Sequence, residues 1–149
     1  MRVSEDTPQR LFVYGTLRQG GCRAIPVLFP AARFLGFGTV RGRLYDFGDY
    51  PGLILDPHGL DILGEVYEVN AHILRAIDDI EDYYPNDVAR SHYFRRTQRI
   101  RMWDGEHLTA DLYECNPRFY DCSQPLDATD WIAWKQRAAQ RGQEANSAS

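Results

Sequence analysis

The chain has 149 residues, a formal net charge of −4 at pH 7 and 44% hydrophobic residues, which favours one domain with its own core and argues against a nucleic-acid-binding surface. No apolar run is long enough to cross a membrane, and the polar start lacks the apolar segment of a signal peptide. The three cysteines include no CxxC pair and the four histidines show no ligand spacing, so we expect reduced thiols, a cytoplasmic location and no metal site.

The first predicted strand is the apolar run Leu11–Tyr14, which follows a polar stretch, residues 1–9, predicted to be a flexible tail. The strand runs into the loop Gly15–Gly21, which contains three glycines. Glycine permits close approach to the backbone, and successive N–H groups in such a turn can point at one anion. The loop is therefore a candidate anion site, and the alternative is an ordinary connection from strand to helix. Arg18 is predicted to be exposed, with binding of a ligand carboxylate as the alternative.

Four elements are predicted in the next part of the chain. A short helix is expected over Cys22–Phe29, where Pro30 follows. The stretch Arg33–Tyr45 has strand composition but is interrupted by glycines, which indicates a bent or bulged strand, as at the corner of a barrel. Two further strands are predicted over Leu53–Leu55 and Asp61–Val69.

The stretch Ala71–Asp82 has the periodicity of an amphipathic helix, with Asn70 as a suitable N-cap. Its apolar face is formed by Ile73, Leu74, Ile77 and Ile80. Glu81 falls on the same face, where an ionised carboxylate is costly unless it is paired, so its pKa tends to rise. A carboxylate with a raised pKa can accept a proton near neutral pH, which makes Glu81 a candidate general base. The alternatives are a buried ion pair, or a helix end that has turned into solvent.

Two strands, Tyr93–Trp103 and Glu106–Cys115, follow a predicted loop over residues 82–91. They are joined by Asp104-Gly105, a strong signal for a hairpin. In the second strand, leucine and alanine alternate with more polar residues, and this alternation predicts that Tyr113 lies on the more polar face.

A last helix is predicted over Asp130–Arg141, and residues 142–149 are small and polar, so a second flexible tail is expected there. Residues 10–141 are therefore predicted to form a single domain. Several short strands with few helices make this an α+β fold. Glycine-broken strands around one hairpin suggest a small sheet that is closed or nearly closed, with the helices outside.

Three groups of residues, taken in chain order, resemble the γ-glutamylcyclotransferase-like (AIG2-like) family, in particular its γ-glutamylaminecyclotransferases and small bacterial members. These are Leu11–Arg18, then Gly64–Val69 with Ile77–Glu81, and then Tyr93 with Leu112-Tyr113. The resemblance implies a small six-stranded, mostly antiparallel β-barrel with flanking helices. It also implies that one cavity is lined by Tyr14, Gly15, Thr16, Leu17 and Glu81.

The resemblance further implies an enzyme that needs no cofactor and releases 5-oxoproline from a γ-glutamyl amine or a related small γ-glutamyl compound. The α-amine of the substrate would attack its own γ-carbonyl carbon, with Glu81 as general acid and base. Tyr93 and Tyr113 are candidate hydrogen-bond donors to the substrate, and the alternative is core tyrosines with satisfied hydroxyl groups. The N–H groups of the glycine loop suit either the developing oxyanion or the α-carboxylate of the substrate.

Two other functions fit the same residues. In one alternative, the cavity is part of a binding module that holds a small amino-acid-like ligand without turning it over, because a fold does not fix a function. In the other, the chain is a tailoring enzyme that removes a γ-glutamyl protecting group in a biosynthetic pathway. In all three interpretations the expected partner is a small molecule, with no nucleic acid and no membrane.

Overall fold

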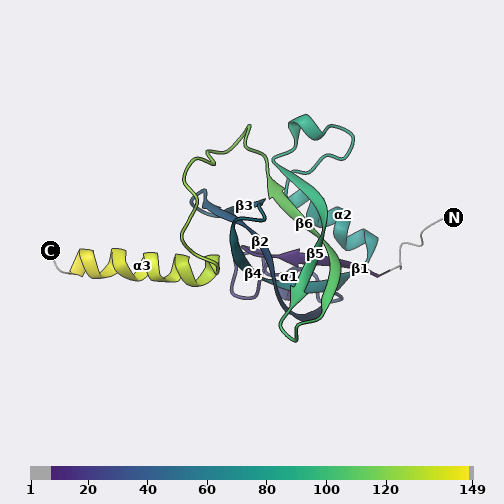
Figure 1. Ribbon diagram of the computed structural model, residues 1–149, viewed down its shortest axis with the longest axis horizontal. Coiled ribbons are helices and arrows are strands. Elements are labelled where there is room, and N and C mark those ends of the chain that lie inside the picture. The colour runs from purple at the N-terminus through teal and green to yellow at the C-terminus, as the bar shows by residue number, and fades with distance from the viewer. Residues whose placement is uncertain (1–7, 148–149) are drawn as a thin grey trace.

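The computed structural model describes residues 8–147, so residues 1–7 of the predicted N-terminal tail lie outside the described residues. The sheet has the strand order β3-β2-β4-β1-β6-β5, and β2 also pairs with β5. Five strands therefore close into a barrel, while β3 lies outside it, paired with β2 (Figure 1). The strands are β1 (Gln9–Val13), β2 (Arg33–Asp46), β3 (Pro51–Leu55), β4 (Leu60–Val69), β5 (Tyr93–Met102) and β6 (His107–Cys115).

The predicted α+β class and mostly antiparallel barrel are confirmed, with the difference that five of the six strands close the ring. Among the described strands, β1 and β6 form the one parallel pair, with Leu11 opposite Asp111. The hairpin at Asp104-Gly105 is confirmed, because β5 and β6 pair directly across it and Gly105 has a φ of 87°.

The bend predicted in the long strand β2 is confirmed. Residues 33–42 of this strand pair with β4, and residues 42–46 pair with β3. The register with β4 shifts between Phe34 and Gly36, and Gly36 has a φ of 137°, a conformation that residues with side chains rarely adopt. This bulge turns the strand so that Gly38 and Thr39 can also pair with β5 and close the barrel.

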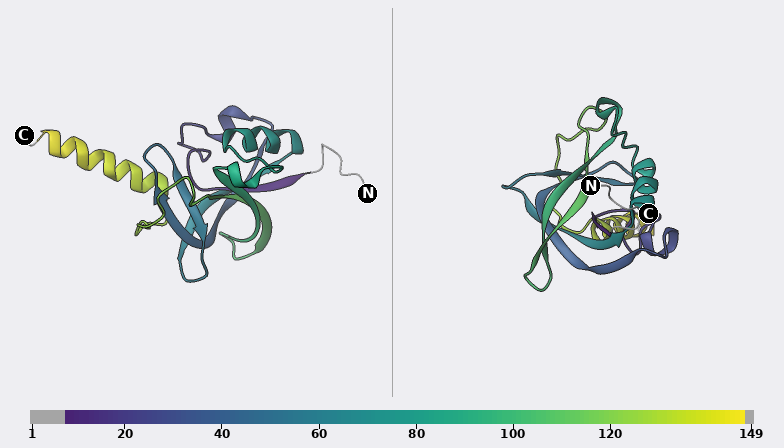
Figure 2. Two further views of the ribbon diagram at one scale, coloured as in Figure 1. Left: turned by 90° about the horizontal axis from the view of Figure 1, so that it is seen from above. Right: turned by 90° about the vertical axis from the view of Figure 1, so that its right-hand side faces the viewer.

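Three helices flank the barrel, α1 (Ile25–Leu28), α2 (Ala71–Ile80) and α3 (Trp131–Ser147), and a single 3₁₀ turn, Val88–Arg90, lies in the loop after α2. Helices α1 and α2 lie on the same side of the barrel (Figure 2). The predicted cap of α2 is confirmed, since the Asn70 side chain accepts a hydrogen bond of 2.8 Å from the N–H of Ile73. Within the described residues, no helix is long and apolar enough to cross a membrane.

The end of α3 differs from the prediction. The helix continues to Ser147, beyond its predicted end at Arg141 and into the segment predicted as a tail. A glycine inside a helix costs about 1 kcal/mol relative to alanine, which the helix-forming residues around it can offset. The N-cap of α3 is Asp130, whose carboxylate accepts a hydrogen bond of 3.1 Å from the N–H of Ala133. The helix projects away from the barrel (Figure 1).

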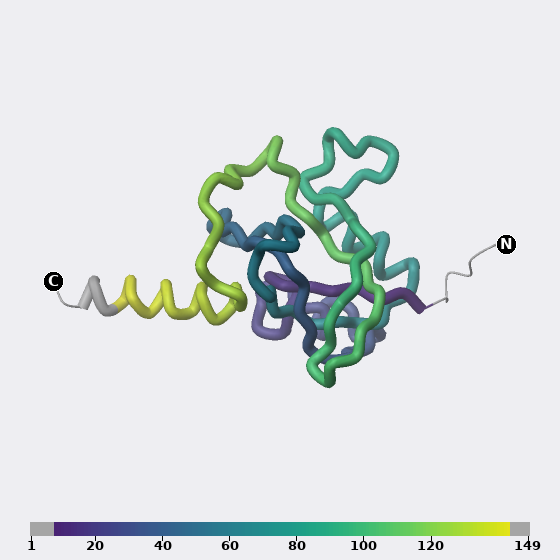
Figure 3. Tube along the Cα trace, viewed as in Figure 1, coloured from purple at the N-terminus to yellow at the C-terminus, as the bar shows by residue number. Residues whose placement is uncertain are grey.

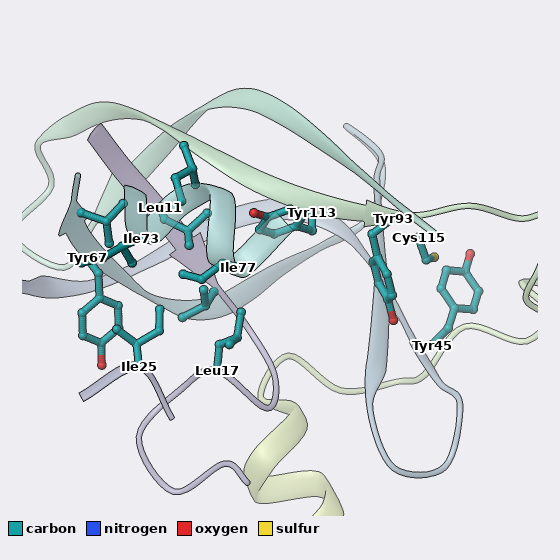
Figure 4. Packing of buried hydrophobic residues seen from close by; sticks show 13 residues of the cluster. Leu11, Leu17, Ile25, Tyr45, Tyr67, Ile73, Ile77, Tyr93, Tyr113 and Cys115 are labelled. Atoms are coloured by element: carbon teal, nitrogen blue, oxygen red, sulfur yellow. The ribbon is translucent and has the colours of Figure 1, made fainter. Parts of the chain in front are cut away.

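From Leu11 onwards, strand β1 is buried on both faces and separates two hydrophobic clusters. Leu11 and Val13 face the cluster beneath α1 and α2, which is shown in Figure 4, whereas Phe12 and Tyr14 belong to the cluster inside the barrel. This division follows from the alternation of side chains along a strand. The prediction of a buried first strand is confirmed, and its end lies where the two clusters meet.

Arg18 is buried, so the prediction that it is exposed is wrong. Its Nε donates a hydrogen bond to Oε2 of Glu65 at 3.0 Å, and its Nη1 donates one to Oδ1 of Asp130 at 2.9 Å. The second oxygen of Glu65 accepts hydrogen bonds from the N–H of Gln19 at 3.0 Å and from the hydroxyl of Tyr67 at 2.7 Å. This network ties the loop after β1 to β4 and to the start of α3. Arg18 therefore binds carboxylates of the protein itself and not the carboxylate of a ligand.

Removal of the Arg18 guanidinium is expected to destabilise the protein strongly, because it leaves the carboxylate of Glu65 buried without a cation. We expect Arg18→Met to lower the free energy of unfolding by about 3–5 kcal/mol, and the double variant Arg18→Met/Glu65→Gln to recover a large part of that loss. Urea denaturation measures both. The matched control is Arg41→Met, whose ion pair with Asp61 is exposed (59% and 55% of the two side chains) and should matter far less. An equal effect at Arg18 and Arg41 would contradict the expectation.

Candidate active site

One cavity brings together residues from five parts of the chain. All seven residues predicted from the sequence line it, namely Tyr14, Gly15, Thr16, Leu17, Glu81, Tyr93 and Tyr113. The remaining lining residues are Phe12, Val13, Tyr50 and Pro51. The cavity is therefore built from the end of β1 with its loop, the start of β3, the end of α2, the start of β5 and the end of β6.

The sheet explains why these segments meet. Because β1 and β6 are parallel and Leu11 pairs with Asp111, both strands end at the same edge, which places Tyr14 close to Tyr113. The hydroxyl of Tyr14 donates a hydrogen bond of 2.6 Å to the backbone carbonyl of Tyr113. Strand β5 is antiparallel to β6, so it begins at this edge, with Tyr93 opposite Cys115. The barrel thus fixes three of the cavity tyrosines relative to one another.

Glu81 lies at the C-cap of α2, and its backbone N–H donates to the carbonyl of Ile77 at 2.9 Å. Its side chain is partly buried and forms part of the cavity wall. Burial raises its pKa to about 7, an effect that Arg23 opposes and Asp82 reinforces. Among residues 8–143, whose side chains the structure describes, its carboxylate has no hydrogen-bond or ion-pair partner, which argues against the alternative of a structural ion pair.

The hydroxyl groups of the cavity tyrosines bond to atoms of the protein. Tyr93 donates to the carbonyl of Pro51 at 2.7 Å, and Tyr113 donates to Oδ1 of Asp78 at 2.6 Å. Burial raises the pKa of both groups, so they stay protonated as donors. This arrangement matches the alternative of core tyrosines with satisfied hydroxyls. Both side chains lie in the cluster of Figure 4, and both residues line the cavity. The predicted polar face for Tyr113 is wrong, because α2 covers this end of β6 and buries the side chain.

Asp78 was not among the residues that the sequence singled out. Its buried carboxylate accepts the hydrogen bond from Tyr113 and lies 3.5 Å from Nε of Arg95. Burial raises its pKa, while Tyr113 and Arg95 oppose that change. The signal was present in the helical pattern, since Asp78 lies about 40° around the helix from Leu74, at the border of the apolar face. Asp78 holds Tyr113 in place from outside the cavity.

The loop after β1 lines the cavity with residues whose backbone donors have no acceptor among the described residues. Within the described part of the chain, the N–H groups of Gly15, Thr16 and Leu17 donate no hydrogen bond, whereas each of their carbonyls accepts one of 2.9–3.0 Å from further along the loop. The fit is close, because a Cβ on Gly15 would lie 2.5 Å from Cγ of Pro51. Free N–H groups in such a turn can bind an anionic group or a developing oxyanion.

The arrangement suits proton transfer beside a polarised carbonyl or carboxylate group. A carboxylate that titrates near neutral pH and a set of free N–H groups share one cavity walled by aromatic rings. Among the described residues, no three side chains of the histidine, cysteine, aspartate or glutamate type come together in a way that could hold a metal ion.

Residues 11–133 match the sequence model of the family described as gamma-glutamyl cyclotransferase, AIG2-like. A protein of Halalkalibacterium halodurans, provisionally named a gamma-glutamylcyclotransferase, is 35% identical over 96 residues, which are 64% of this chain and 82% of that protein. The gamma-glutamylaminecyclotransferase of Rattus norvegicus is 29% identical over 135 residues and 82% of each chain. Among solved structures, an AIG2-like protein of Mus musculus has a TM-score of 0.61 at 26% identity, covering 79% of this chain and 91% of that one.

Carbon-detected NMR titration of the side-chain carboxyl groups tests the environment of Glu81. We expect one glutamate to titrate with a midpoint near pH 7, because burial raises the pKa of Glu81 to about 7. This resonance should be absent from the spectrum of the Glu81→Gln variant, and its absence there assigns the resonance to Glu81. If the resonance that disappears titrates near the ordinary glutamate value of 4.5, the carboxylate is solvated and its burial is refuted.

Proposed function

The chain belongs to the gamma-glutamyl cyclotransferase, AIG2-like family and is an enzyme of that family. We propose that it releases 5-oxoproline from a γ-glutamyl amine or a related small γ-glutamyl compound. The observation that carries this proposal is Glu81, a carboxylate on the wall of the cavity that has a pKa of about 7 and no partner among the described side chains. The name of the rat relative, a gamma-glutamylaminecyclotransferase, supports an amine as the leaving group.

The proposed reaction is an intramolecular transfer of the γ-glutamyl acyl group. The α-amine of the substrate attacks its own γ-carbonyl carbon, and the new C–N bond closes a five-membered ring. The tetrahedral intermediate then breaks the original amide bond, which gives 5-oxoproline and the free amine. Because the nucleophile is already tethered, correct positioning supplies much of the acceleration, and well-oriented intramolecular reactions reach effective molarities of about 10⁵–10⁸ M.

Glu81 carries the proton in this mechanism. The α-ammonium group must lose a proton before it can attack, and the departing amine must gain one. A carboxylate with a pKa of about 7 is a much better acceptor than an ordinary glutamate, and once protonated it is still acidic enough to return the proton to the leaving amine. No covalent bond to the protein is needed, so the exposed thiol of Cys22 has no role in this scheme.

The free N–H groups of Gly15, Thr16 and Leu17 are the proposed partners of a negative group on the substrate. They can stabilise the γ-carbonyl oxygen as it gains charge, or they can hold the α-carboxylate. Loss of one donor to a developing oxyanion typically costs about 10²–10³ in rate. Arg18 does not serve this purpose, because its guanidinium is occupied by Glu65 and Asp130.

The decisive variant is Glu81→Gln, assayed with a panel of γ-glutamyl amines and direct detection of 5-oxoproline. We expect kcat/KM to fall by about 10²–10⁴, because the amide side chain cannot accept the proton. The matched control is Asp79→Asn, an exposed acid on the outer face of α2, which should retain activity. Full activity in Glu81→Gln would refute the assignment of the base.

The same panel separates the alternative functions. A wild-type protein that binds these compounds without releasing 5-oxoproline would be a binding module. Turnover confined to γ-glutamyl derivatives of larger biosynthetic intermediates would favour a tailoring enzyme. Release from small γ-glutamyl amines supports the proposal.

The pH dependence of the reaction provides a second test of Glu81. Because the ionised carboxylate is the active form, kcat/KM should rise with pH through an ionisation near pH 7. Asp82 contributes to the raised pKa, so this ionisation should move to lower pH in Asp82→Asn. A flat profile between about pH 5 and 8 would contradict a buried carboxylate as the base.

A further inference from the structure

Four aromatic side chains form a contiguous cluster beside the cavity, and we call Phe47, Tyr50, Tyr93 and Tyr120 the aromatic wall. The Tyr50 ring meets those of Tyr93 and Tyr120 edge to face, with centroid distances of 6.5 and 6.0 Å. Tyr93 and Tyr120 are 5.6 Å apart. Phe47 stacks on Tyr120, with centroids 4.3 Å apart and planes 15° apart. The wall thus runs without a break from the cavity outwards.

The wall is assembled from segments that are distant in sequence. Residues 116–130, between β6 and α3, run past the turn between β2 and β3, and the N–H of Leu126 bonds to the carbonyl of Leu44 at 2.8 Å (Figure 3). This path brings Tyr120 against Phe47 and Tyr50. No element of the proposed chemistry requires this arrangement.

The wall is continuous with the proposed reaction centre. Tyr50 and Tyr93 line the same cavity as Glu81, and Glu81 contributes to the raised pKa of both Tyr93 and Tyr120. Tyr50, which lines the cavity, is 38% exposed, so the wall is in contact with solvent beside the cavity. A substrate group that extends from the reacting carbonyl towards solvent would therefore pass along these rings.

The wall offers ring surfaces more than hydrogen bonds. The hydroxyl of Tyr93 donates to the carbonyl of Pro51 at 2.7 Å, and the hydroxyl of Tyr120 lies 3.1 Å from Nδ1 of His92. The hydroxyl of Tyr50 bonds to that of Tyr120 at 3.5 Å. A flat aromatic group can meet such rings in offset-stacked or edge-to-face geometry, which a saturated group of the same size cannot do.

We propose that the aromatic wall binds the leaving amine of the substrate and that the enzyme prefers γ-glutamyl amides whose amine carries an aromatic ring. This inference rests on the proposed function. The substituent of the leaving amine is bonded outside the ring that forms, so it projects from the γ-glutamyl group held near Glu81. Tyr50, Tyr120 and Tyr93 are then residues that determine specificity.

The test compares γ-glutamyl-phenethylamide with γ-glutamyl-(2-cyclohexylethyl)amide. The two substrates have the same carbon skeleton, and one six-membered ring is aromatic in the first and saturated in the second. We expect the wild-type protein to favour the phenethylamide by about three- to tenfold in kcat/KM. Tyr50→Leu and Tyr120→Leu should each reduce this ratio towards one, whereas Tyr50→Phe, which keeps the ring, should retain it. Comparison of ratios removes the intrinsic difference between the two leaving amines.

The matched control is Trp103→Leu, which removes an aromatic ring that is 75% exposed at the hairpin between β5 and β6. It should leave the ratio unchanged. Equal kcat/KM for the two substrates, or a preference that survives both Tyr50→Leu and Tyr120→Leu, overturns this inference while leaving the proposed function intact. If the wild-type protein releases 5-oxoproline from none of the three compounds, namely these two substrates and γ-glutamyl-methylamide, the proposed function itself is overturned, and this inference with it.

Discussion

The buried guanidinium of Arg18 joins three parts of the chain that are far apart in sequence. It binds Glu65 in β4 and Asp130 at the start of α3, while Glu65 also holds the N–H of Gln19. These bonds hold the loop after β1, whose residues Gly15, Thr16 and Leu17 line the cavity. The geometry of the site therefore depends on an ion-pair network that takes no part in the proposed chemistry.

Two carboxylates three residues apart on α2 have opposite surroundings. Asp78 accepts a hydrogen bond from Tyr113 and lies near Arg95, whereas Glu81 has no partner among the side chains of residues 8–143. The helical periodicity of the sequence was sufficient to single out Glu81 as a carboxylate on an apolar face. It could not reveal the partners of Asp78, because Arg95 and Tyr113 lie in β5 and β6, which the chain reaches more than ten residues later.

Features of the fold that depend on neighbouring residues were predictable. Asn70 caps α2, Asp104-Gly105 forms the hairpin and Gly36 forms the bulge, because each acts through bonds or dihedral angles a few residues away. The errors concern long-range packing. A loop arginine gives no local sign of carboxylates 47 and 112 positions away, and alternation along β6 could not show that α2 covers Tyr113. Closure by five strands likewise depends on the non-local pairing of β2 with β5.

Because β3 lies outside the barrel, the pairing that stabilises the barrel does not depend on the strand that forms one wall of the cavity. This strand carries Pro51 on the cavity wall, yet its ladder joins it to β2 alone. On the cavity side, the Pro51 carbonyl accepts a hydrogen bond from the hydroxyl of Tyr93. Displacement of the start of β3 would break that bond while the five-stranded ring kept all of its own pairing. One wall of the pocket thus belongs to a strand outside the ring, and the other walls belong to the ring and to α2. Exchange of substrate and product need not compromise the frame that aligns the reacting groups.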